Sequence, residues 1–185
     1  MTPDALTAAL TRPAPPDPAG PWPVPDILRP AAVLLAVEGD RLWLTKRATG
    51  LAHHPGQIAL PGGKVDPTDA DAVACALRES QEEIGLPPAS VCVLGALPPH
   101  PTVTGFTITP VVGLLHTRFT PRPEVGEVAE VFAVPLTHIL DPASYRLESR
   151  IWGGRTRRYW VAPWGPYYIW GATAGILRDL AVRVG

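Results

Sequence analysis

The chain has 185 residues, 46% of them hydrophobic and 18% charged, which is enough material for one domain with a substantial core. Its net charge of −1 gives no overall attraction for nucleic acid or for an anionic membrane surface, so we expect neither as a partner. The chain has no run of ~18 apolar residues that could span a bilayer and no basic-then-apolar signal pattern, so we expect a cytoplasmic protein.

Residues 1–30 differ in composition from the rest of the chain, because they hold nine of its 24 prolines. Proline removes backbone donors and favours extended chain, so no regular element is expected between residue 12 and residue 30. We interpret residues 1–30 as an arm that lies over a domain formed by residues 31–185, with Trp22 or Ile27 as docking side chains. A ligand for a proline-recognising domain is the alternative role of this arm.

The pattern of apolar residues and turn residues predicts mixed strands and a few helices after residue 30. The expected elements are a hairpin at 31–37 and 41–45, a loop with a short strand at 46–60, a helix at 68–84, strands at 91–97 and 107–115 joined by a loop at 98–101, a strand at 128–134, a short helix at 136–140, a second hairpin at 145–152 and 156–161, and a helix at 171–182. No repeated strand–helix–strand rhythm is present, which indicates the α+β class.

The helix at 68–84 carries three carboxylates within five residues. With Glu79 at zero on a wheel of about 100° per residue, Glu82 lies near −60° and Glu83 near +40°. On the same wheel an apolar side made of Val73, Leu77 and Ile84 is expected opposite the acids.

Acids this close repel one another, and at the end of a helix they oppose its dipole. Sequences violate such rules where function requires it, and clustered oxygen ligands suit a hard cation such as Mg²⁺ or Mn²⁺. A solvated helix face is the alternative interpretation.

The residues at both ends of this helix carry turn signals. Thr68 followed by Asp71 fits a capping box at the start, and Gly85 followed by Pro87 fits a C-terminal stop. The preceding turn at 61–63, Pro-Gly-Gly, can bring backbone close to the acids because glycine has no side chain. The sequence therefore predicts a loop–helix–loop unit whose acids face one way.

Residues 63–86 resemble the Nudix box, whose pattern is G-x5-E-x7-R-E-U-x-E-E-x-G-U with U apolar. The matching positions are Arg78, Glu79, Glu82, Glu83, Gly85 and Leu86. Asp69 stands where the pattern has its first glutamate, with one extra residue before Arg78, and Ser80 stands at an apolar position. Because of the first departure, we assign no metal-binding role to Asp69.

The resemblance implies an α/β/α sandwich with a mixed β-sheet. It also implies metal binding by Glu79, Glu82, Glu83 and the backbone carbonyl of Gly63, with Arg78 orienting the carboxylates.

Residues 44–48, 56–58 and 60–63 resemble L-L-T-x-R-(S or A)-x3-R-x3-G-x3-F-P-G-G, the motif of the coenzyme A pyrophosphatase branch of the Nudix family. Further similarity to this branch lies at 104–113, 127–136 and 169–174. The branch implies cleavage of coenzyme A to 3′,5′-ADP and 4′-phosphopantetheine. The motif's internal arginine is replaced here by Ala52, so ADP-ribose, NADH or other nucleotides stay open as substrates. A non-catalytic nucleotide-sensing module is the alternative of another class.

Residues outside the acidic helix are candidates for the rest of the site. The general base is expected from the cluster of Glu124, Glu127 and Glu130 in a later loop, with Glu127 favoured and Glu79 as the alternative; a solvated strand edge is the other interpretation of the cluster. Arg47 and Lys46 are candidates for substrate phosphates, with ordinary surface charge as the alternative, and His54 could also lie near phosphate. An aromatic-rich segment at 160–170 could stack a nucleobase or form core or homodimer contacts.

Overall fold

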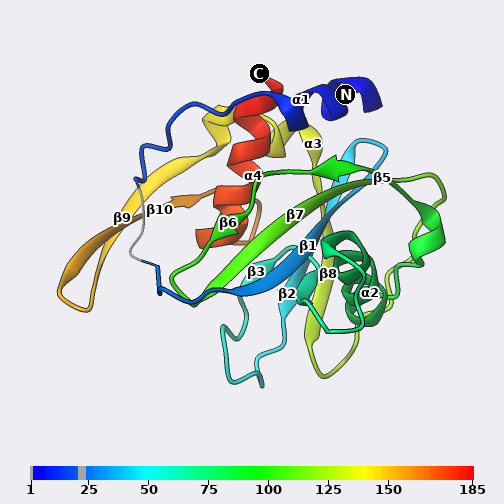
Figure 1. Ribbon diagram of the computed structural model, residues 1–185, viewed down its shortest axis with the longest axis horizontal. Helices are drawn as coiled ribbons and strands as arrows, with labels where there is room; N and C mark the ends of the chain where they lie inside the picture. The colour runs from blue at the N-terminus through cyan, green and yellow to red at the C-terminus, as the bar shows by residue number, and fades with distance from the viewer. Residues whose placement is uncertain (1, 21–23) are drawn as a thin grey trace.

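The computed structural model describes residues 2–20 and 24–185 and shows a mixed β-sheet with helices on both faces (Figure 1). The strands of this sheet are β1 Arg29–Glu38, β2 Arg41–Arg47, β3 Ile58–Ala59, β4 Gly62–Lys64, β5 Val91–Ala96, β6 His100–Pro101, β7 Phe106–Leu115 and β8 Val128–Pro135. The other elements are α1 Pro3–Thr11, α2 Ala72–Ile84, α3 Leu136–Ile139 and α4 Gly171–Val184, 3₁₀ turns at Pro88–Ser90 and Pro142–Ser144, and a hairpin of β9 Arg146–Trp152 and β10 Arg155–Val161. The predicted α+β class is confirmed.

The central strand β1 separates two apolar layers. It runs parallel to β7 and antiparallel to β2 and β4, so the sheet is mixed. Successive side chains of a strand point to opposite faces, and β1 follows this alternation. Leu34 and Ala36 pack with α2, while Leu35 and Val37 pack with α4. Helix α2 therefore covers one face of the sheet and α4 the other (Figure 1), which makes an α/β/α sandwich.

Both predicted hairpins form, and two details of the predicted elements were wrong. The helix predicted to begin at residue 68 begins at Ala72, because Asp71 is its N-cap. The segment at 98–101 is not entirely loop, because β6 pairs with β7 through His100 and Pro101. Proline is tolerated there because a short strand at an edge does not need every backbone donor.

The N-terminal segment begins with a helix. Leu6 and Ala9 of α1 are buried in the apolar cluster around α4, and the two chain ends lie close together (Figure 1). Arg12 Nη1 donates to the carbonyls of Arg183 at 3.1 Å and Val184 at 3.2 Å. Ile27 is 85% exposed, so its predicted docking was wrong, and Trp22 lies outside the described residues.

The hairpin of β9 and β10 extends from the main sheet on the side of α4 (Figure 1). The segment that follows it returns to the core, where Val161, Ala162 and Ile169 are buried. In the described residues no helix is long and apolar enough to cross a membrane.

Candidate active site

Helix α2 is held in place by polar caps at both ends. The Asp71 carboxylate accepts a hydrogen bond from the Ala74 amide at 2.8 Å, while Thr68 bonds to Asp66 instead, so the predicted Thr68 cap was wrong. At the other end Gly85 has φ 72°, a left-handed conformation that suits glycine, and its amide donates to the Gln81 carbonyl. The helix therefore has a fixed start and a fixed end.

The face that α2 buries includes the predicted apolar side and extends beyond it. Ile84 is buried, and Val73 and Leu77 pack against the same cluster, as predicted. Cys75, Ala76, Ser80 and Glu83 are buried as well, so the expectation that all the acids lie opposite the apolar side was wrong for Glu83. Ser80, the departure from the apolar pattern, is accommodated by donating to the Ala76 carbonyl at 2.6 Å.

Glu83 is a buried carboxylate placed against the glycine turn. It is only 5% exposed, and its Oε2 accepts a hydrogen bond from the Gly62 amide at 3.1 Å. Burial raises the pKa of Glu83 to about 7; the Gly62 amide and Arg47 act against this rise, while Glu79 and Glu127 add to it. A buried carboxylate with this little compensation is unusual away from functional sites.

Glu79 lies one helical turn before Glu83 and faces the next glycine. A Cβ atom at Gly63 would overlap the Glu79 carboxyl group, so this carboxylate occupies the space that a side chain would fill. Burial raises the pKa of Glu79, the hydrogen bond from Arg78 lowers it, and the charges of Glu82 and Glu127 raise it further. The turn therefore packs two carboxylates directly against backbone.

Arg78 connects the remaining acids of the helix. Its Nε and Nη2 form a two-pronged ion pair with Asp69 at 2.9 Å each, and its Nη1 donates to Glu79 and Glu82 at 3.0 Å each. These hydrogen bonds hold the pKa of Asp69 well below its usual range. Glu82 is the outer member of the group, with its side chain 60% exposed. Arg78 thus holds the carboxylates of Asp69, Glu79 and Glu82 in fixed orientations, while its own side chain stays 30% exposed.

The residues at the turn fit a divalent cation. Burial and mutual repulsion disfavour the charged forms of Glu79 and Glu83, and a hard cation with oxygen ligands would stabilise both carboxylates. Among the described residues, no three His, Cys, Asp or Glu side chains converge closely enough to enclose a metal ion by themselves. A cation here would therefore need backbone oxygens or water as well, as Mg²⁺ commonly does.

Two predicted residues from other segments come close to these carboxylates. The charge of Glu127, in the loop before β8, raises the pKa of both Glu79 and Glu83, and its carbonyl accepts from the Ala48 amide at 2.8 Å. The positive charge of Arg47, at the end of β2, contributes to lowering the pKa of Glu83 and that of His54. The fold thus brings residues from β2, α2 and the loop before β8 to one place.

Lys46 and His54 lie farther along the same edge. Together with Gln57, Tyr168 and Trp170 they line a cavity of about 370 Å³. The pKa of His54 is lowered, first by burial and then by Arg47 and His53, so its imidazole is neutral at neutral pH. Lys46 and His54 therefore lie next to Arg47 and do not belong to the cluster of carboxylates.

Sequence reasoning did not single out the second hairpin as part of the site. Arg150, Trp152, Arg157 and Tyr159 line a further cavity that also contains His54. The available signal was the position of Arg150 and Arg157, which a symmetric hairpin around 153–154 places opposite each other.

A family model described as NUDIX domain matches residues 27–151. The chain is 44% identical over 160 residues to an uncharacterized Nudix hydrolase NudL of Enterobacter sp. (strain 638), covering 85% of this chain and 83% of the relative. It is 45% identical to the protein of that name from Salmonella paratyphi B, with the same coverage of both chains.

Two solved structures share the fold. One is a C. elegans Ap4A hydrolase in a binary complex, with a TM-score of 0.50 and 18% identity over 58% of this chain and 80% of that one. The other is a Nudix hydrolase from Nitrosomonas europaea, with a TM-score of 0.51 and 18% identity over 60% of each chain. At this level of identity the likeness concerns the fold alone.

Proposed function

The chain belongs to the Nudix hydrolase family, and on that premise we propose that it is a metal-dependent enzyme that cleaves the pyrophosphate of coenzyme A or its thioesters. The observation that carries the proposal is the pair of carboxylates, Glu79 and Glu83, packed against Gly62 and Gly63. Burial and mutual repulsion disfavour the charged forms of this pair in the protein alone, and a cation beside a substrate phosphate would stabilise them.

In this proposal Glu79, Glu83 and the Gly63 carbonyl hold Mg²⁺ or Mn²⁺, with Glu82 as an outer ligand or a ligand through water. The bound ion supplies neutralisation of phosphoryl charge and a lower pKa for a coordinated water. Arg78 positions Glu79 and Glu82 while anchored to Asp69. Glu127, close enough for its charge to raise the pKa of Glu79 and Glu83, is the candidate for the residue that accepts a proton from the attacking water.

Choice of substrate rests on the segment before the glycine turn. Its resemblance to the coenzyme A pyrophosphatase branch supports coenzyme A. Arg47 supplies positive charge near the carboxylates, and Lys46 lies farther along the same edge. Ala52 removes the positive charge of the branch motif, and neutral His54 does not replace it. ADP-ribose or NADH is therefore the second candidate substrate, and the observation that favours it is Ala52 in place of the motif's arginine.

The test of this function is turnover of a substrate panel with Mg²⁺ or Mn²⁺. Coenzyme A, its thioesters, ADP-ribose, NADH and free nucleotides are incubated with the protein, and products are separated by chromatography. We expect 3′,5′-ADP and 4′-phosphopantetheine from coenzyme A. No turnover of any compound would favour the nucleotide-sensing module, although the intact carboxylate pair argues against it.

Glu79→Gln and Glu83→Gln test the carboxylates directly. Each substitution keeps the shape and removes the charge, and we expect kcat to fall at least ~100-fold, because charge stabilisation is among the largest catalytic terms. Glu124→Gln, in the loop that also holds Glu127, serves as the matched control and should keep wild-type kcat. Full activity in either helix variant would remove the proposed ligand assignment.

Ala52→Arg tests the choice between substrates. A charge-assisted contact to phosphate is worth roughly 1.5–3 kcal/mol, or about ten- to a hundredfold in affinity. We expect the arginine to raise kcat/KM for coenzyme A relative to the analogue that lacks the 3′-phosphate. An unchanged ratio would show that position 52 does not set specificity.

A further inference from the structure

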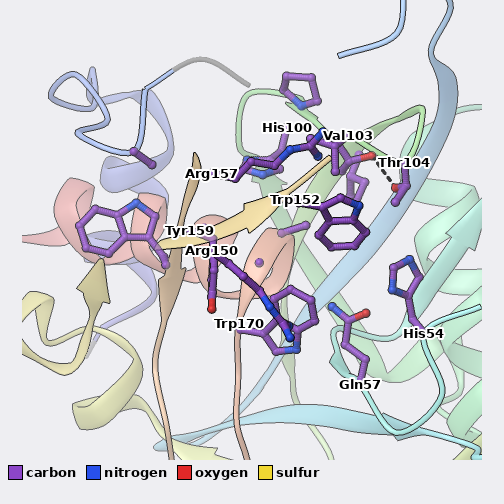
Figure 2. A pocket seen from close by; sticks show the side chains of 18 of the residues that line it. His54, Gln57, His100, Val103, Thr104, Arg150, Trp152, Arg157, Tyr159 and Trp170 are labelled. Carbon is purple, nitrogen blue, oxygen red and sulfur yellow. Dashed lines mark hydrogen bonds between the residues drawn. The ribbon is translucent and has the colours of Figure 1, made fainter. Parts of the chain in front are cut away.

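A cavity of about 270 Å³ lies between the β9–β10 hairpin, the loop from β6 to β7 and the start of α4 (Figure 2). Its aromatic walls are Trp152, Tyr159, Trp160 and Trp170. Rings of this kind offer flat surfaces on which another flat ring can stack. The volume is near the lower end of the range for small-molecule sites, about 300 Å³, and so suits one part of a larger ligand.

Two arginines face this cavity from directly opposite positions on the hairpin. Arg150 pairs with Arg157 in the β9–β10 register, which puts both side chains on the same face of the hairpin. Within residues 2–20 and 24–185, neither guanidinium forms a salt bridge, and the Nε of Arg157 is buried without a hydrogen-bond partner. Like charges at such a pair are destabilising, so a ligand with negative charge would relieve the repulsion.

The acids near the cavity are already engaged elsewhere. Asp17 accepts hydrogen bonds from Trp160 Nε1 and the Ala19 amide at 2.9 Å each. Glu148, on the same hairpin face as Arg150, accepts from the Tyr168 hydroxyl at 2.7 Å. Both carboxylates keep their negative charge, but in the described part of the chain neither forms a salt bridge with Arg150 or Arg157, so no ion pair occupies either guanidinium group.

The cavity adjoins the segment that carries Arg47. His54, Gln57 and Trp170 line this cavity (Figure 2) and also the one that contains Lys46. The Arg47 amide donates to the Gln57 carbonyl at 3.0 Å, so the shared wall of the two cavities is bonded to the end of β2, and the charge of Arg47 in turn lowers the pKa of Glu83. One extended ligand could thus place a flat ring between the aromatic walls and a pyrophosphate beside Arg47.

We propose that this cavity binds a purine ring together with the phosphate on its ribose, which is the 3′-phosphoadenosine end of coenzyme A. The proposal rests on the proposed function for the identity of the nucleotide. In it Arg150 and Arg157 hold the 3′-phosphate, and Trp152 and Trp170 flank the base. The hairpin then supplies the positive charge that the loop containing Ala52 lacks.

The experiment measures binding of 3′,5′-ADP and adenosine to the full-length protein by titration calorimetry, with and without Mg²⁺. Arg150→Gln and Arg157→Gln should each weaken binding of 3′,5′-ADP about tenfold or more and change adenosine binding much less. Trp152→Leu should weaken both ligands about tenfold, because stacking does not depend on phosphate. Arg158→Gln, exposed and on the other face of β10, is the matched control and should bind both ligands as wild type does.

Equal loss for both ligands in the arginine variants, or no loss in either, would overturn the proposal. It would also be overturned if ultracentrifugation showed a dimer that Trp152→Leu dissociates, because the cavity would then be covered by a second copy. Failure of the enzymatic function gives a different result. If only the enzymatic function fails, the protein binds 3′,5′-ADP through the two arginines and leaves coenzyme A intact. If only the cavity proposal fails, the protein cleaves coenzyme A and the arginine variants bind 3′,5′-ADP as the wild type does.

Discussion

At the scale of single residues, Gly62 and Gly63 are adjacent but constrained by different neighbours. A Cβ at Gly62 would overlap the Ala32 carbonyl oxygen and the Val33 Cα, and its φ of +150° is one that other residues rarely adopt. A Cβ at Gly63 would overlap only the carboxyl group of Glu79, which a side-chain rotation can move. Gly62 is therefore required for close packing against strand β1, and Gly63 leaves the space that the Glu79 carboxylate occupies.

Alanine at each glycine separates these roles. Gly63→Ala should fold with a melting temperature near that of the wild type but lose at least ~10-fold in kcat, because Glu79 must leave its position. Gly62→Ala should lose stability by roughly 1–3 kcal/mol, because backbone atoms must move. Urea unfolding and steady-state kinetics on both variants check the prediction. Full kcat in Gly63→Ala would show that Glu79 works from another position.

The ion pair between Arg78 and Asp69 is a contact that could not be predicted from the sequence. The resemblance to the Nudix box singled out Arg78 and its three glutamates, because these residues match the motif position by position within one helix. The ion pair with Asp69 depends on a turn of several residues, in which the Asp66 amide donates to Asp69 at 2.8 Å. Helical periodicity does not describe such a turn, so the bond could not be derived from sequence spacing.

At the scale of elements, the C-terminal end of α2 was predicted correctly and its N-terminal start was not. The left-handed Gly85 at its end was predicted from sequence because only one residue type suits that backbone. Its start was misplaced because Thr68, Asp69 and Asp71 all carry capping side chains. The apolar side of α2 was predicted correctly, but the burial of Glu83 was not, because it depends on packing against the glycine turn of a different segment.

Removal of each candidate cap tests the observed start of α2. Asp71→Ala should lower the free energy of unfolding by about 0.5–2 kcal/mol, because the Ala74 amide loses its partner. Thr68→Ala should change it by less than about 0.5 kcal/mol, since Thr68 lies in an exposed turn. Denaturant unfolding of the two variants gives the comparison. A larger effect at Thr68 would move the helix start back to the predicted position.

Strand β6 adds a titratable group to the interface with α4. His100 packs against Gly175, and burial lowers its pKa below the ordinary value of 6.5, while Asp17 and Asp179 oppose the shift. A base with a lowered pKa in the folded state binds fewer protons there than in the unfolded chain. Its contribution to stability is therefore present above pH 6.5 and is lost as the pH falls through the folded-state pKa.

We accordingly expect His100 to lower the free energy of unfolding as the pH falls from 7 to 5, by up to about 1.4 kcal/mol per pH unit, while the raised pKa of Glu83 contributes in the opposite direction over this range. His100→Gln should remove the loss that comes from His100, because glutamine does not titrate, and so make the variant more stable at pH 5 relative to pH 7 than the wild type is. His53→Gln, in an exposed loop, is the control and should keep the wild-type slope. The same slope in all three proteins would place the pH dependence on other groups.

At the scale of the whole molecule, the α+β class was predictable from the pattern of strands and helices, and the sandwich was implied by the resemblance to the Nudix family. The place of the N-terminal segment was not, because its prolines dominate the composition and conceal a helix of nine residues. We propose that residues 1–30 are an arm to the domain of residues 31–185, docked through α1 rather than through Ile27. Its buried residues close the outer side of α4, as the neighbouring termini in Figure 1 suggest.

Leu6 and Ile27 give a matched test of that docking, since both are large apolar residues of the arm. Leu6 is 1% exposed and Ile27 is 85% exposed. Leu6→Ala should lower the free energy of unfolding by about 2–5 kcal/mol, because it opens a cavity against α4. Ile27→Ala should change it by less than about 0.5 kcal/mol, as for other exposed sites. Chemical denaturation measures both values, and a Leu6→Ala protein as stable as the wild type would mean that α1 does not dock on α4 in solution.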